Sequence, residues 1–101
     1  MKDYQKRVDE WISQYKYGYF KPLEILARLT EEVGELAREV NHRFGPKKKK
    51  PTEETKELGD EIADIVFTLI CIANSLNIDL DEHFEKMMEK YNQRDKDRWK
   101  K

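Results

Sequence analysis

Apolar residues recur at helical spacing through almost the whole chain, and most of the few glycines and prolines fall between these stretches. From residue 3 to residue 17 the apolar positions lie three or four apart, as on one face of an α-helix. The same spacing returns from Pro22 to about Phe44, from residues 52–55 to about Leu76, and from Asp81 to Lys90. No stretch alternates polar and apolar residues as a half-buried strand would. We therefore expect one all-α domain over residues 1–101, built as a four-helix bundle.

The third of these segments carries the strongest burial pattern. Residues 65–73 read IVFTLICIA and are apolar nearly all round, which predicts burial on more than one side. A domain this short has little core of its own, so this burial predicts a partner subunit and an oligomer-forming chain. Thr52 is the expected N-cap of the segment, with Thr55 as the alternative. Cys71, the only cysteine, is expected to act as a small buried hydrophobe.

The balance of charges and the lengths of the apolar runs indicate which kinds of binding partner to expect. Charged residues make up 41% of the chain, but 20 Lys and Arg nearly balance 21 Asp and Glu. This balance argues against a nucleic-acid binder, which would need a large positive excess. The N-terminal sequence has no apolar signal-peptide core, and the longest apolar run is too short to span a bilayer. We expect a cytoplasmic, soluble protein with no nucleic-acid or membrane partner.

The positions of the acidic residues are the most informative feature for function. The second segment contains EExxE, and the third contains ExxD. Residues three apart lie on the same side of a helix, so each motif directs a pair of carboxylates one way. If the two helices pack side by side, these carboxylates converge. The residues are Glu31, Glu32, Glu35, Glu61 and Asp64.

Asp64 is the hardest of these acids to explain structurally, because it directly precedes the apolar run. A buried carboxylate costs several kcal/mol (~3–5) unless it is paired, hydrogen-bonded or bound to a metal. Clustered carboxylates suit hard divalent cations, Mg²⁺ above all. The competing interpretation is ordinary surface ion pairing, since Arg28–Glu32 and Glu35–Arg38 have the spacing of helical salt bridges.

A diiron carboxylate bundle is a rival metal site that the sequence argues against. Such sites need two Glu-x-x-His motifs. Glu39 and His42 supply one, but Leu80 stands three residues before His83, the only other histidine. His42 is better explained as a cation at the end of its own helix. The chain also has no Gly-rich phosphate loop and no Cys-x-x-Cys motif.

The strings TEEVGELAREVN and ELGDEIADIVFTLICIANSL together resemble the MazG-like nucleotide pyrophosphohydrolases, an all-α group whose motifs are EExxE and ExxD. The resemblance spans roughly residues 23–94. It implies Mg²⁺-dependent cleavage of a nucleoside triphosphate to a monophosphate and pyrophosphate, with Mn²⁺ as an alternative cation, by a homodimer or homotetramer. By the same resemblance, Glu32, Glu35, Glu61 and Asp64 match the metal ligands. Glu35 and Glu31 are the candidate catalytic carboxylates, with Glu31 in a water-orienting or outer-sphere role.

Substrate contacts are less well defined by the sequence. Lys90, Asn92 and Arg94 fall where related proteins often contact substrate, although a solvated surface explains them equally well. Lys56 and the Lys47–Lys50 loop are further candidate phosphate contacts, with a solvated linker as the alternative. Asn74 is a candidate to bind a base edge or to cap a neighbouring turn. The aromatic residues that could stack on a nucleobase, or equally form plain core, are Trp11, Tyr15, Tyr19 and Phe20.

The function expected from these residues is removal of non-standard or excess nucleoside triphosphates. Two alternatives stay open. One is a non-catalytic helical interaction module whose acid pairs are structural. The other is hydrolysis of a phosphoribosyl-nucleotide at the same site.

Overall fold

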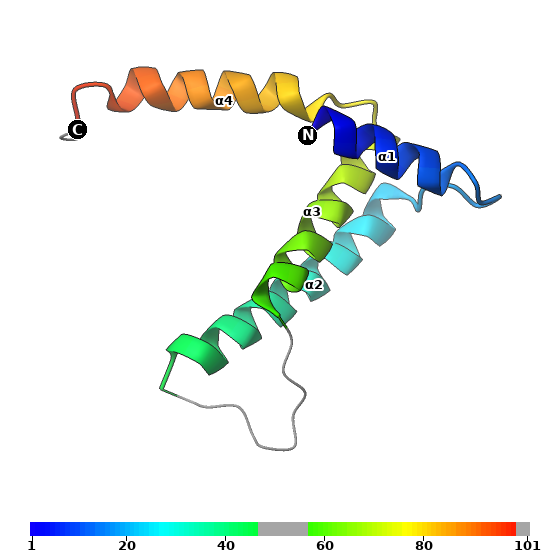
Figure 1. The fold of residues 1–101 in the computed structure, drawn as a ribbon, viewed down its shortest axis with the longest axis horizontal. Helices are drawn as coiled ribbons and strands as arrows, with labels where there is room; N and C mark the ends of the chain where they lie inside the picture. Colours follow the sequence, from blue (N-terminus) through cyan, green and yellow to red (C-terminus); the bar gives the residue numbers. More distant parts are fainter. Residues whose placement is uncertain (47–56, 99–101) are drawn as a thin grey trace.

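The structure is a computed structural model that describes residues 1–46 and 57–98 (Figure 1). Within these ranges it contains four helices and no strand, as the sequence predicts. The helices are α1 (Lys2–Ile12), α2 (Pro22–Phe44), α3 (Leu58–Ser75) and α4 (Leu80–Asp95).

The first helix is shorter than its apolar spacing predicts, because it ends at Ile12 and not near Tyr17. The amides of Gln14 and Tyr15 donate to carbonyls only three residues back. This is the tighter 3₁₀ pattern of hydrogen bonds, and the α-helix ends there. Gly18 then adopts a φ of 72°, a left-handed conformation that favours glycine. The connector therefore folds its aromatic side chains back toward the helices.

The second helix begins and ends where the sequence predicts. Pro22 occupies its first turn, and Glu24 reaches back to accept from the amide of Lys21 over 3.2 Å. At the other end, the amide of Gly45 donates to the carbonyl of Asn41 over 2.9 Å. A Cβ at position 45 would lie 2.6 Å from that oxygen, so glycine is required for the close approach.

The remaining two helices differ from the prediction at one end each. α3 begins at Leu58, and the predicted caps Thr52 and Thr55 lie outside the described residues. α4 starts after Asp79, whose carboxylate accepts from the amides of Asp81 and Glu82. It continues beyond the predicted end at Lys90 to Asp95.

Two of the helices form the body of the molecule. α2 and α3 run antiparallel and side by side, and α1 crosses α3 near its C-terminal end (Figure 1). Ile12, Ile25 and Cys71 bring the three helices together in a small buried cluster. Cys71 is therefore a buried free thiol, as predicted.

The fourth helix does not pack along the other three. It leaves α3 at a bend of 110° and extends away from the α2–α3 pair (Figure 1). None of its residues is buried. In the described part of the chain, no single helix is long and apolar enough to cross a membrane; only the bent pair α3–α4 reaches that length and composition.

Candidate active site

Three carboxylates meet between α2 and α3 and are called here the acid cluster: Glu32, Glu61 and Asp64. One oxygen from each lies within 4.8 Å of one oxygen of the others. Glu61 is buried, Glu32 is half-buried and Asp64 is exposed, so the expectation that Asp64 is the buried carboxylate was wrong. The predicted convergence of the two motifs is therefore what the folded chain contains.

The surroundings of Glu32 disfavour its ionised form. Burial is the main cause that raises the pKa of Glu32 above its usual value, and repulsion from Asp64 and Glu35 adds to the increase. Glu61 contributes in the same direction, whereas the nearby Arg28 cation lowers the pKa. Grouped carboxylates with this behaviour favour a bound cation.

The donor set of the acid cluster fits a hard divalent cation. Magnesium binds oxygen ligands at about 2.0–2.1 Å, so oxygens around one such ion lie roughly 2.9–4.2 Å apart. The ligand oxygens of the acid cluster lie within 4.8 Å of one another, close to the upper end of this range. Carboxylate oxygens are also the ligand type that these cations prefer. The acid cluster can therefore hold a metal ion.

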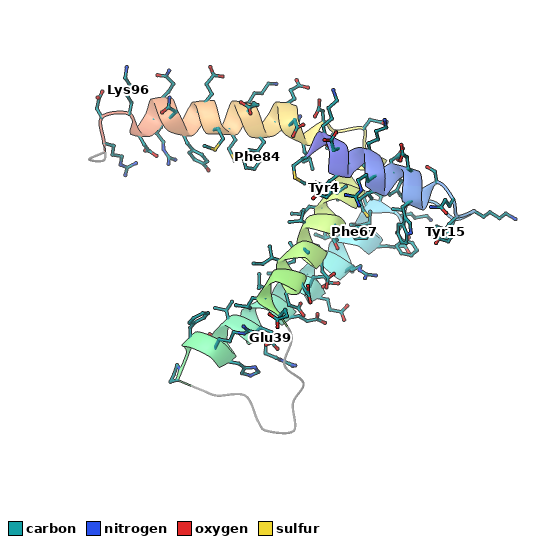
Figure 2. The ribbon with its side chains drawn as sticks, in the orientation of Figure 1. Tyr4, Tyr15, Glu39, Phe67, Phe84 and Lys96 are labelled. Carbon is teal, nitrogen blue, oxygen red and sulfur yellow. The ribbon has the colours of Figure 1, made fainter. Side chains whose placement is uncertain are left out.

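Three other acidic residues of α2 lie near the acid cluster in sequence but are not part of it. Glu35 lies one turn after Glu32, is half-buried, and is close enough to raise the pKa of Glu32. Glu31 is exposed and lies outside the group, so its outer-sphere role stays a prediction. Glu39, which sequence reasoning placed only in the rejected diiron motif, is buried one further turn along (Figure 2).

An aromatic pocket of about 320 Å³ opens at the α1 end of the α2–α3 pair. Trp11 packs edge-on against Tyr15 at 5.4 Å and against Phe67 at 5.9 Å between ring centroids. Figure 2 shows Tyr15 and Phe67 at this end of the molecule and Glu39 toward the other end. The pocket is lined by Trp11, Ile12, Tyr15, Tyr17, Gly18, Tyr19, Phe20, Ile25, Arg28, Phe67, Thr68 and Cys71.

The aromatic pocket and the acid cluster are adjacent on both helices. Arg28 lines the pocket, and its Nε lies 3.5 Å from Oε1 of Glu32, one turn later on α2. Thr68 also lines the pocket, and its hydroxyl donates to the carbonyl of Asp64, one turn earlier on α3. One helical turn, about 5.4 Å, thus separates the apolar pocket with its aromatic rings from the carboxylates of the acid cluster.

Six of the described aromatic residues line the pocket, and sequence reasoning named four of them, Trp11, Tyr15, Tyr19 and Phe20, but not Tyr17 or Phe67. It missed Arg28 as a pocket residue, and it missed the α3 side of the pocket. The available signal was spacing, because residues 25, 28 and 32 share one face of α2. Residues 64, 68 and 71 share one face of α3 in the same way.

Asn74 occupies a different place from the aromatic pocket. Its Oδ1 accepts from the Gln5 side chain at 2.9 Å, and its Nδ2 donates to the Gln5 carbonyl and to the Tyr19 hydroxyl, each at 2.9 Å. The amide thus ties α1 and the pocket wall to α3. The predicted contact of Asn74 with a base edge stays a prediction. To make that contact, the Asn74 amide would have to give up hydrogen bonds to Gln5 or Tyr19.

The predicted phosphate contacts on α4 lie far from the acid cluster within one chain. Lys90, Asn92 and Arg94 are exposed on the helix that extends away from α2 and α3 (Figure 1). Arg94 forms an ion pair with Asp95 at 2.9 Å. The other candidates, Lys56 and the Lys47–Lys50 loop, lie outside the described residues.

Comparison with known proteins agrees with this geometry. A family model described as the MazG nucleotide pyrophosphohydrolase domain matches residues 20–99. The protein YpjD of Bacillus subtilis (strain 168) is 60% identical over 99 residues, covering 98% of this chain and 89% of YpjD.

Two solved structures share the fold. A crystal structure of YpjD from Bacillus subtilis has a TM-score of 0.81 at 57% identity, covering 90% of this chain and 93% of that one. The crystal structure of the Bacillus-conserved MazG protein, a nucleotide pyrophosphohydrolase, has a TM-score of 0.80 at 52% identity, covering 96% and 94%. The fold, the paired acidic motifs and these matches together show that this chain belongs to the MazG nucleotide pyrophosphohydrolase family.

Proposed function

We propose that this chain is a Mg²⁺-dependent nucleoside triphosphate pyrophosphohydrolase, releasing a nucleoside monophosphate and pyrophosphate. The observation that carries the proposal is the placement of the aromatic pocket one helical turn from the acid cluster. A nucleoside triphosphate has the same order of parts: a flat base, a sugar, and then a chain of anionic phosphates. One substrate molecule can therefore fill both halves of the site.

The acid cluster is proposed to bind Mg²⁺, with Mn²⁺ as a substitute, through Glu32, Glu61 and Asp64, and with Glu35 as a further ligand. These residues would hold a cation that could neutralise charge on the phosphates and lower the pKa of an attacking water. Glu35 is also proposed to accept the proton of that water, since it stands one turn beyond Glu32. The exposed Glu31 is left with an outer-sphere role. Hydrolysis of a triphosphate requires from the protein mainly this positioning of reactants and this neutralisation of charge.

The aromatic pocket is proposed to hold the base. Its aromatic rings offer stacking surfaces, and Trp11 is half-exposed at the pocket, where a ring could lie against a planar ligand. Stacking on aromatic side chains accepts every base, because every base has a π-face. This mode of binding agrees with removal of several excess or non-standard nucleotides.

A homodimer or homotetramer is proposed because one chain leaves too much apolar surface uncovered. The radius of gyration is 17.4 Å, whereas a compact chain of about 100 residues has ~13 Å. Ile62, Val66 and Leu69 on α3 are each more than a third exposed. A second apolar strip, called here the α4 apolar face, consists of Phe84, Met87, Met88 and Tyr91 at helical spacing.

Oligomerisation also gives a role to the predicted phosphate contacts of α4. Lys90, Asn92 and Arg94 lie on this helix, which within one chain extends away from the α2–α3 pair (Figure 1). If they contact substrate phosphates, as the resemblance implies, they do so in the site of a second copy. The projecting α4 has the shape that such an exchange requires.

The proposed function is tested by pyrophosphate release from a panel of standard and modified nucleoside triphosphates, with Mg²⁺, with Mn²⁺ and with a chelator. A phosphoribosyl-nucleotide belongs in the panel as the alternative substrate. Metal-dependent release from the triphosphates is the expected result. Folded protein that releases nothing with either cation would support the interaction module, and release only from the phosphoribosyl compound would support the biosynthetic alternative.

A further inference from the structure

Arg28 stands at the boundary between the two halves of the candidate site. It lines the aromatic pocket, and it is the only charged residue among those that the structure gives as pocket lining. Its Nε lies 3.5 Å from Oε1 of Glu32, a member of the acid cluster. Thr68 also lines the pocket, but it carries no charge and its hydroxyl meets only the main-chain carbonyl of Asp64 in the bond that ties it to the acid cluster.

The guanidinium of Arg28 has donors to spare. An arginine carries five N–H groups, and the one partner of Arg28 among the described residues is Glu32, approached through Nε. The side chain is 60% exposed, so its terminal nitrogens are accessible to a ligand. Burial raises the pKa of Glu32 and of Cys71, and the charge of Arg28 opposes both increases, so this side chain is close to the acid cluster and to the pocket.

The covalent order of a nucleotide determines which of its groups would meet Arg28. With the base in the aromatic pocket and the outer phosphates at the acid cluster, the sugar and the α-phosphate span the turn between them. The sugar is uncharged, whereas the α-phosphate presents two non-bridging oxygens with negative charge. A planar guanidinium matches such a pair of oxygens in a bidentate contact.

We propose that Arg28 is a substrate-binding residue that exchanges partners: it pairs with Glu32 in the free protein and with the α-phosphate once a divalent cation fills the acid cluster. The cation repels the guanidinium and competes for the charge of Glu32, and the phosphate offers a replacement anion. The exchange would link metal binding to orientation of the α-phosphate. This inference rests on the proposed function and assigns a residue that the paired acidic motifs do not include.

The test compares the affinities of a nucleoside and its monophosphate, which differ only in the α-phosphate. Calorimetry in Mg²⁺ gives both dissociation constants for the wild type, Arg28→Gln and Arg28→Lys. Arg38→Gln is the matched control, because Arg38 is exposed on the same helix and does not line the pocket. Charge-assisted hydrogen bonds of this kind correspond to roughly tenfold or more in affinity.

The monophosphate is expected to bind the wild type and Arg38→Gln more tightly than the nucleoside does. In Arg28→Gln this ratio should fall about tenfold, while nucleoside affinity stays unchanged, and Arg28→Lys should keep part of the ratio. An unchanged ratio in Arg28→Gln overturns the inference while leaving the proposed function intact. A wild type that binds no nucleotide and releases no pyrophosphate removes both.

Discussion

The side-chain amide of Asn74 donates a 2.9 Å hydrogen bond to the Tyr19 hydroxyl, which in turn donates to Asp9 over 2.7 Å. This chain of bonds joins the interior of α3 to a wall of the aromatic pocket and to α1. Burial, more than the neighbouring Asp9, raises the pKa of Tyr19 to about 12, so its hydroxyl stays protonated at neutral pH.

Tyr19→Phe should therefore destabilise the protein by about 1–2 kcal/mol, because it leaves the amide of Asn74 and the carboxylate of Asp9 without their shared partner. The measurement is the free energy of unfolding from denaturant titration. Tyr4→Phe is the control, since Tyr4 is exposed on α1 and lines no pocket wall. Equal stability of the two variants would mean that this chain of bonds does not stabilise the fold.

Tyr15→Ala should raise KM about tenfold or more with little change in kcat, because it removes a stacking ring from the aromatic pocket and leaves the acid cluster unaltered. Steady-state kinetics with one nucleoside triphosphate measure both constants. Tyr4→Ala serves as the control for loss of an exposed tyrosine. A fall confined to kcat would place Tyr15 outside the base site.

Charge in the acid cluster should make the metal-free protein sensitive to pH. The pKa of Glu32 is raised in the folded chain, so its ionised form costs stability above that pKa. The cost disappears as pH falls through the raised pKa and then below the usual value of 4.5, where Glu32 is protonated in both the folded and the unfolded chain. At neutral pH, Mg²⁺ at ~100 times its dissociation constant should add about 2.7 kcal/mol.

Glu32→Gln separates these effects. In chelator at neutral pH, the variant should melt at or above the wild-type temperature, and Mg²⁺ should stabilise it less. Asp60→Asn removes an exposed acid from the start of α3 and should respond to Mg²⁺ as the wild type does. Equal Mg²⁺ stabilisation of Glu32→Gln and the wild type would exclude Glu32 as a ligand.

The α4 apolar face should be part of an interface between copies of the chain. Met88→Asp places a charge there and should weaken association by ~30-fold or more. Light scattering after size exclusion measures the oligomeric state across protein concentrations. Glu85→Gln changes an exposed residue of the same helix and should leave assembly intact. A wild type that is monomeric at all concentrations would contradict the proposed assembly.

Most of the fold follows from spacing and from backbone chemistry. Pro22 and Gly45 set the ends of α2 because one suits a first helical turn and the other permits a close approach to the Asn41 carbonyl. The end of α1 could not be predicted, because the apolar spacing continues to Tyr15 while hydrogen bonds to carbonyls three residues back close the helix. Tyr15 lies beyond the end of α1, and its side chain lines the aromatic pocket.

The acid cluster was predictable because each motif fixes one helix face, and antiparallel packing brings the two faces together. The pocket was predictable only in part. Its aromatics stand near one another in sequence, whereas Phe67 and Arg28 reach it through the register of α2 against α3, which depends on tertiary packing. The direction of α4 depends on the turn at Asn77, whose φ is 56°, and nothing in the apolar pattern encodes that bend.

The proposed function requires the acid cluster to be the catalytic centre of a nucleotide site. Its most direct test is kcat for pyrophosphate release by Asp64→Asn and Asp60→Asn, each at saturating Mg²⁺ and nucleoside triphosphate. Both variants lose one exposed carboxylate from α3, but only Asp64 belongs to the acid cluster. Asp64→Asn should lose at least ~100-fold in kcat, whereas Asp60→Asn should keep near-wild-type turnover. Near-normal turnover by a folded Asp64→Asn would contradict the proposed function.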